Sequence, residues 1–207
     1  MVTREVLRKS LDQFESVVFC AENYQTIEGL NKIVEYGEQV LRLFPPEENP
    51  EISAYTAYHI RNAYWERARY YSHRGHFLHS KDPENPKQGI TDYNRLLEIL
   101  SMTDKSTNNT MFLWEVFEGR CECYMKIGDT GAALNEANLL VKNFSESKNN
   151  AYSEVKAYLF RSKYALSLGL LDLANKDIGV VLEKASNEQE ISEALRIQKR
   201  ISEKKGE

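Results

Sequence analysis

A pattern of side-chain sizes recurs three times along the chain, and it constrains the fold more than any other feature. Each copy ends in a glycine, with a large aromatic residue eleven positions before it and a small residue seven positions before it. These positions share one helix face, so the small residue lets a paired helix approach while the aromatic fills the space beside it. The glycine then frees the backbone to end one helix and turn into the next. The aromatics are Tyr64, Phe117 and Tyr158, the small residues Ala68, Cys121 and Ser162, and the glycines Gly75, Gly128 and Gly169.

Helical periodicity runs through nearly every segment of the chain. The first segment, for example, puts Leu7, Leu11 and Phe14 on one stripe. No stretch alternates in the manner of a half-buried strand, so the sequence predicts an all-α fold. The predicted helices, about nine in number, span about 3–21, 26–44, 50–72, 86–102, 111–127, 131–144, 150–168, 171–185 and 187–204.

Cap residues, prolines and glycines separate the predicted helices. The pair Asn49 and Pro50 opens the third helix with a cap residue and a proline in the first turn. The stretch 75–85 is the longest predicted loop. Ser186, with Gln189 three positions later, has the form of a capping box and predicts the start of the last helix.

The second and third copies of the pattern continue into the helix that follows. Ala133 stands five residues past Gly128, and Ala174 stands five residues past Gly169. The order of an aromatic, a small residue, a tyrosine, a Gly-Asp turn and an alanine resembles the tetratricopeptide repeat. The glycines at 75, 128 and 169 are further apart than the standard period of about 34 residues, so the array is irregular, with inserted loops.

The resemblance covers about residues 51–185, and it implies a right-handed α-solenoid of antiparallel helix hairpins. On this interpretation the whole chain, 1–207, is a single domain. It would consist of an N-terminal hairpin over 3–44, three hairpins of the repeat type over 50–185, and a C-terminal capping helix over 187–204.

Composition and charge exclude several classes of protein. The longest apolar run, Val17 to Ala21, is far shorter than the roughly 18 residues that a membrane span needs. The amino terminus lacks the layout of a secretory signal, so we expect a cytoplasmic or nuclear protein. Three cysteines are too few for a disulfide framework, and we expect them to be buried thiols. The net charge is -4, with acids and bases interspersed, and nucleic acid is therefore not the expected partner.

The resemblance also implies a binding surface. In tetratricopeptide proteins the first helix of each hairpin lines a concave groove, and the face opposite the small residues contacts the ligand. An aromatic and arginine patch beside an acidic and a basic row would suit a mixed-charge peptide or helix. Mapped onto this chain, the groove residues are Asn62, Trp65, Glu66, Arg69 and His73, then Glu115, Glu118, Glu122 and Lys126, then Lys156, Leu159 and Lys163.

Other interpretations of these residues are less well supported. A co-chaperone would grip the carboxylate end of a chaperone tail, but of the residues it needs only Lys156 stands in place. Arginines interleaved with aromatics over 61–74 could stack on single-stranded RNA, although the repeat packing already uses those aromatics. His73, His76 and His79 lack a neighbouring cysteine or carboxylate at ligand spacing, so no metal site is predicted.

The sequence contains no phosphate-binding loop, nucleophile elbow or zinc-protease motif. We therefore expect no enzyme activity, no cofactor and no small-molecule substrate. The leading hypothesis is a non-catalytic adaptor that binds a peptide or helix of a partner protein within a larger complex. The alternatives are a co-chaperone and a single-stranded RNA-binding or regulatory module, and self-association through an end helix is left open.

Overall fold

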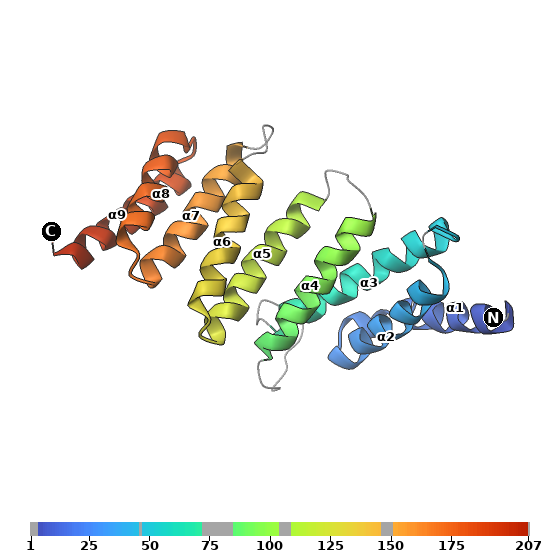
Figure 1. Ribbon diagram of the computed structural model, residues 1–207. Coiled ribbons are helices and arrows are strands. Elements are labelled where there is room, and N and C mark those ends of the chain that lie inside the picture. Colours follow the sequence, from blue (N-terminus) through green and yellow to red (C-terminus); the bar gives the residue numbers. More distant parts are fainter. Residues whose placement is uncertain (1–3, 46, 72–84, 104–108, 146–150, 207) are drawn as a thin grey trace. The chain divides into compact units, whose positions relative to one another are not determined.

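The computed structural model describes residues 4–45, 47–71, 85–103, 109–145 and 151–206 (Figure 1). Over these residues the chain forms nine α-helices and one short 3-10 helix, with no strand, as the sequence predicts. The elements are α1 (Arg4–Val18), η1 (Ala21–Tyr24), α2 (Ile27–Leu43), α3 (Pro50–Tyr71), α4 (Pro86–Thr103), α5 (Asn109–Lys126), α6 (Thr130–Ser145), α7 (Ala151–Ser167), α8 (Leu171–Lys184) and α9 (Glu188–Lys205).

The chain divides into two compact units, Met1–Gly119 and Arg120–Glu207, with the boundary inside α5. In the first unit α1 packs on α2, α2 on α3 and α3 on α4. In the second unit α6 packs on α7, α7 on α8 and α8 on α9, and α9 also packs on α7. The predicted packing of helices on their neighbours in sequence is therefore confirmed for these pairs.

The small residues of the recurring pattern are buried, as their proposed role requires. Ala68, Cys121 and Ser162 each have 0 % exposure, and the aromatic Tyr64 and Phe117 are buried as well. Because a small side chain brings paired helices close together, these positions set the spacing within each hairpin.

The two described turn glycines end their helices as predicted. Gly128 and Gly169 adopt φ values of 81° and 75°, in the left-handed region that favours glycine. The next amide in each turn donates to a carbonyl five residues back, Asp129 N to Tyr124 O at 2.9 Å and Leu170 N to Ala165 O at 2.8 Å. This hydrogen bond is the mark of the Schellman motif. Gly75 lies outside the described residues.

The end of the first helix differs from the prediction. α1 ends at Val18 rather than near residue 21, because the Asn23 side chain donates to Val17 O at 2.8 Å and η1 follows. The backbone of Asn23 lies directly against Gly29 of α2, where a Cβ atom would overlap it. Cys20 lies past the end of α1 and is exposed, so its predicted burial is wrong, whereas Cys121 and Cys123 are buried.

The start of the last helix is one residue later than the predicted capping box. Asn187 is the cap, with extended backbone, and its Oδ1 accepts from Glu190 N at 2.9 Å. The Asn187 side chain reaches the amide of the third helical residue, Glu190. Asn187 is therefore the cap residue in place of Ser186, and Glu190 stands three residues after it in place of Gln189.

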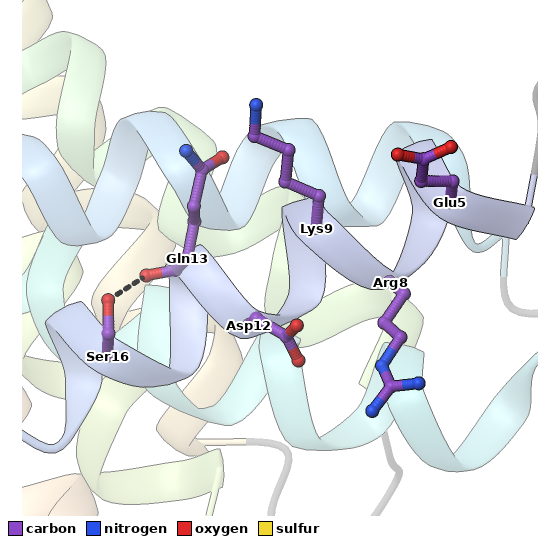
Figure 2. Close-up of a pocket in the computed structure, with 6 residues that line it drawn as sticks. All are labelled: Glu5, Arg8, Lys9, Asp12, Gln13 and Ser16. Carbon is purple, nitrogen blue, oxygen red and sulfur yellow. Dashed lines mark hydrogen bonds between the residues drawn. The ribbon is translucent and has the colours of Figure 1, made fainter.

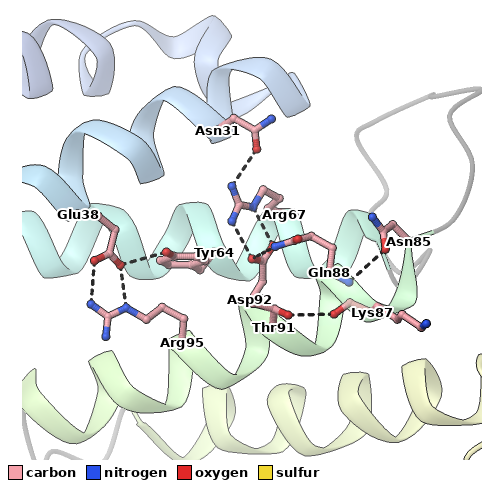
Figure 3. A network of polar contacts seen from close by, with 10 residues as sticks. All are labelled: Asn31, Glu38, Tyr64, Arg67, Asn85, Lys87, Gln88, Thr91, Asp92 and Arg95. Atoms are coloured by element: carbon pink, nitrogen blue, oxygen red, sulfur yellow. Dashed lines mark hydrogen bonds and ion pairs between the residues drawn. The ribbon is translucent and has the colours of Figure 1, made fainter.

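A half-buried arginine joins three helices in each unit, in an arrangement that we call the arginine clamp. In the first unit Arg67 of α3 donates Nε and Nη2 to the two carboxylate oxygens of Asp92 on α4, both at 2.7 Å. Its Nη1 donates to Asn31 Oδ1 on α2 at 2.8 Å (Figure 3). The Asp92 side chain has 0 % exposure, so this ion pair is shielded from solvent.

The second unit repeats the clamp with the same geometry. Arg161 of α7 donates Nε and Nη2 to Asp177 on α8 at 2.8 and 2.7 Å, and Nη1 to Asn138 on α6 at 2.9 Å. Both clamp arginines stand eight residues before a glycine of the recurring pattern, Gly75 or Gly169. The repetition extends the internal similarity of the chain from side-chain sizes to specific polar contacts.

Arg120, eight residues before Gly128, forms an incomplete clamp. Its Nη2 lies 2.8 Å from Oε1 of the buried Glu136. Among the described residues, Arg120 Nε and Glu136 Oε2 are both buried without a hydrogen-bond partner. Glutamate is one methylene longer than the aspartate in the other two clamps, and only one of its oxygens is engaged.

Shortening Glu136 to aspartate is expected to complete this clamp. Arg120 and Glu136 have the same spacing in sequence as Arg161 and Asp177, so an aspartate should reach the guanidinium with both oxygens. We expect Glu136→Asp to raise the free energy of unfolding by about 1 kcal/mol, the value of one recovered hydrogen bond. Urea denaturation measures the change, and Asp177→Glu is the reverse control, which should lower stability. A loss of stability in Glu136→Asp would contradict the geometric explanation.

His59 makes the first unit sensitive to pH. The ring lies among aromatic neighbours, with its Nδ1 2.8 Å from Tyr24 Oη and its centroid 4.7 Å from that of Tyr55. Burial lowers the pKa of His59 from its ordinary value of 6.5. Below pH 6.5 the His59 side chain takes up a proton in the unfolded chain more readily than in the folded protein. The contribution of neutral His59 to the free energy of unfolding is therefore complete above pH 6.5, and it declines as the pH falls below that value. Urea denaturation between pH 7 and 5 should show a shallower decline for His59→Gln than for the wild type.

Candidate functional site

An aromatic and arginine stripe runs along the open side of α3. The opposite side of this helix is buried against α2 and α4 through Ala57, Ile60, Ala63 and Ala68. The stripe consists of residues that remain exposed or half-buried and that recur with helical spacing. Its members, which we call the α3 stripe, are Tyr58, Arg61, Asn62, Trp65 and Arg69.

Stacking holds both arginines of the α3 stripe in place. The Arg61 guanidinium lies 4.9 Å from the centroid of the Tyr58 ring, and the Arg69 guanidinium lies 4.4 Å from that of Trp65. Tyr58 is 53 % exposed, which makes it the most accessible ring of the stripe. Because each arginine is already ordered on an aromatic face, a ligand that contacts it would cost less side-chain entropy than one that orders a free arginine.

Acidic residues adjoin the stripe where α3 approaches α5. Glu66 on α3 lies 3.6 Å from Arg69, and Glu115 on α5 is close enough to raise the pKa of Glu66. Burial is the larger cause of that rise, and the attraction of Arg69 opposes it without cancelling it. On α5, Glu118 Oε2 accepts from Trp114 Nε1 at 3.0 Å.

The structure therefore brings together part of the predicted groove. Arg69 contacts both Trp65 and Glu66, and Glu115 of α5 is near enough to Glu66 to act on its charge. Asn62 belongs to the same stripe, and His73 lies outside the described residues.

The predicted groove residues of the second unit are engaged differently. Leu159 is only 5 % exposed and packs in the core with Ile197 and Ile201, so its predicted exposure in a groove is wrong. The reason is that α9 packs on α7 and covers this position. Lys163 is paired with Glu193 of α9 at 2.7 Å. Glu122 and Lys156 are half-buried, and Lys126 is exposed at the end of α5.

Three residues of this surface were missed as groove residues by the sequence reasoning. Tyr58 lies one helical turn before Asn62 on the same stripe, so the spacing alone could have found it. Arg61 was considered only as a residue that could stack on RNA. Trp114 stands four residues before Glu118, and this spacing within a helix could have indicated their side-chain contact. Arg67, another RNA candidate, is held in a clamp instead.

A shallow depression lies on the outer face of α1. Its lining residues all come from this one helix, where Ser16 Oγ donates to Gln13 O at 2.8 Å (Figure 2). A surface formed by a single helix face does not enclose a ligand, so we do not treat it as the functional site. The lining residues are Glu5, Arg8, Lys9, Asp12, Gln13 and Ser16.

Within the described residues, no group of three or more histidine, cysteine, aspartate or glutamate side chains is arranged to hold a metal ion. His73, His76 and His79 lie outside them. No helix in the described part of the chain is long and apolar enough to cross a membrane.

Comparisons of the chain with protein-family models, with curated proteins and with solved structures find no match.

Proposed function

We propose that the protein is a non-catalytic interaction module whose α3 stripe binds a peptide or helix of a partner protein. The observation that carries this proposal is the pair of aromatic and arginine stacks on the open side of α3, Tyr58 with Arg61 and Trp65 with Arg69. We further propose that the helix hairpins form a right-handed solenoid of the tetratricopeptide type, with α9 as the capping helix.

The composition of the stripe supports a protein ligand. Tryptophan, tyrosine and arginine are the residues that contribute most to binding energy at protein interfaces, because they combine large apolar contact with directed polar groups. α3 is clamped to both of its neighbours by Arg67, which makes the surface rigid. A rigid, preordered face binds with a smaller entropic cost.

The recurring turn and clamp positions support the repeat interpretation. Gly128 and Gly169 end their helices in the same conformation, and Arg67 and Arg161 make the same contacts. A repeat of this kind presents successive helices to a ligand and needs no enclosed pocket.

Affinity capture with a matched pair of variants tests the proposal. The variant Tyr58→Ala with Arg69→Ala removes one ring and one cation from the stripe, and it should lose the proteins that the wild type retains. Arg196→Ala is the control, since this arginine is on α9 and its side chain is 70 % exposed. Circular dichroism should show equal helix content in all three proteins. If the stripe variant retains the same proteins as the wild type, the proposal is wrong.

A further inference from the structure

The incomplete clamp leaves one donor and one acceptor unused at a place where the complete clamps form a hydrogen bond. In the complete clamp of the second unit, Arg161 Nε donates to Asp177 Oδ2 at 2.8 Å. The equivalent atoms of the incomplete clamp are Arg120 Nε and Glu136 Oε2, because the arginine and the acid have the same spacing in sequence. Neither atom has a hydrogen-bond partner among the described residues. The incomplete clamp therefore lacks the second of its two hydrogen bonds.

Both unused atoms are buried. Glu136 is only 4 % exposed, and the Arg120 side chain is 15 % exposed, exactly as the Arg161 side chain is. One turn before Glu136 the helices α5 and α6 are in close contact, since Cys121 Sγ donates to Ala133 O at 3.2 Å and both residues have 0 % exposure. A buried donor or acceptor without a partner costs free energy, so a group from outside the chain should satisfy this pair.

The ion pair places the two unused atoms close to each other. Arg120 Nη2 lies 2.8 Å from Glu136 Oε1. Nε and Nη2 form one edge of a guanidinium, and this is the edge that Arg161 presents to its aspartate. Oε2 belongs to the same carboxylate as Oε1. The contact through Nη2 and Oε1 therefore leaves Nε and Oε2 within reach of one small molecule.

The chemistry of the two atoms defines what this molecule is. It must accept a hydrogen bond from Arg120 Nε and also donate one to the carboxylate of Glu136. A chloride ion can accept but cannot donate, and an ammonium ion can donate but cannot accept. Water does both, and buried waters in proteins are held by polar groups that would otherwise be unsatisfied.

We propose that a buried water molecule bridges Arg120 Nε and Glu136 Oε2 and so completes the third clamp. The water accepts from the Nε–H group and donates to the carboxylate, in the place of the direct hydrogen bond of the other clamps. The attachment of α6 to α5 then depends on this water as well as on the ion pair. The site lies within the second unit and is independent of the α3 stripe.

NMR of the full chain with ¹⁵N-labelled arginine tests the proposal, because each clamp supplies one Nε–H resonance. The Hε atom of Arg120 should show a nuclear Overhauser effect to a long-lived water, with the same sign as the effects within the protein. The Hε atom of Arg161 should show none, because it donates directly to Asp177. Arg196, whose side chain is 70 % exposed, provides the signal of a guanidinium that is open to bulk solvent.

A pair of variants shows whether the water depends on the length of the acid. Glu136→Asp should abolish the water signal at Arg120, because the shorter carboxylate meets Nε directly. Glu203→Asp is the matched control, since it makes the same change on α9 at a side chain that is 62 % exposed, and it should leave the water signal in place. A high-resolution crystal structure of the wild type should contain a water within hydrogen-bond distance of both atoms.

Several results would overturn the bridge. Absence of any effect from water at Arg120 Hε would show that Nε has a partner within the chain. Exchange at Arg120 as rapid as that at Arg196 would show that the group is open to bulk solvent. Persistence of the water signal in Glu136→Asp would show that the water does not join these two residues, and so would a direct hydrogen bond between Nε and Oε2 in the wild-type crystal.

Discussion

Replacing Asp177 by alanine is expected to lower the free energy of unfolding by about 3–5 kcal/mol, because it leaves a buried guanidinium without its counter-ion. Asp177 has 0 % side-chain exposure, and only 15 % of the Arg161 side chain is exposed. The aspartate accepts two hydrogen bonds from Arg161 and so fixes α8 to α7. Urea denaturation gives the loss, and hydrogen exchange read over α7 and α8 locates it.

Two controls separate the clamp from general effects of charge removal. Asp172 is on the same helix with a fully exposed side chain that contacts Lys205 at 3.2 Å, so Asp172→Ala should leave stability unchanged. Replacing both Arg161 and Asp177 by leucine should be less damaging than Asp177→Ala, since neither charge is then left unpaired. If Asp177→Ala costs no more than Asp172→Ala, the clamp does not hold the hairpin together.

The helices of this chain could be predicted because their signals are local. Apolar periodicity together with residues such as Asn49 and Pro50 placed the helix limits within a few residues. The end of α1 was misplaced because it depends on a tertiary contact, in which the backbone of Asn23 packs against Gly29. No local pattern reports that contact.

The candidate site was only partly predictable for the same reason. Trp65 and Arg69 were found because helical spacing puts them one turn apart, beside the face that carries the buried Ala68. Leu159 was misassigned because its exposure depends on α9, which begins 29 residues later and packs over α7. The clamps were missed because they pair residues on different helices, and nothing local marks Asp92 as the partner of Arg67.

Gly119 of α5 lies directly against the Tyr93 ring of α4, and a larger residue there should be strongly destabilising. A Cβ atom at this position would overlap the ring of Tyr93, which is fully buried with 0 % exposure. Leucine is a better helix former than glycine by roughly 1 kcal/mol, so local propensity alone would favour the substitution. Over-packing costs typically 1–3 kcal/mol and can exceed that for several added carbons. We expect the steric term to win, with a net loss of about 2–3 kcal/mol in Gly119→Leu.

A second glycine supplies the control with the opposite sign. Gly179 is inside α8, where a Cβ atom would meet no other atom within 4 Å. Gly179→Leu should therefore gain stability from helix propensity, by roughly 0.5–1 kcal/mol in urea denaturation. Adding Tyr93→Ala to Gly119→Leu should recover part of the loss, because the cavity left by the ring accepts the leucine, and the two effects will be non-additive. Equal effects of leucine at 119 and 179 would show that Gly119 does not serve close packing, and the contact between α4 and α5 would then need another explanation.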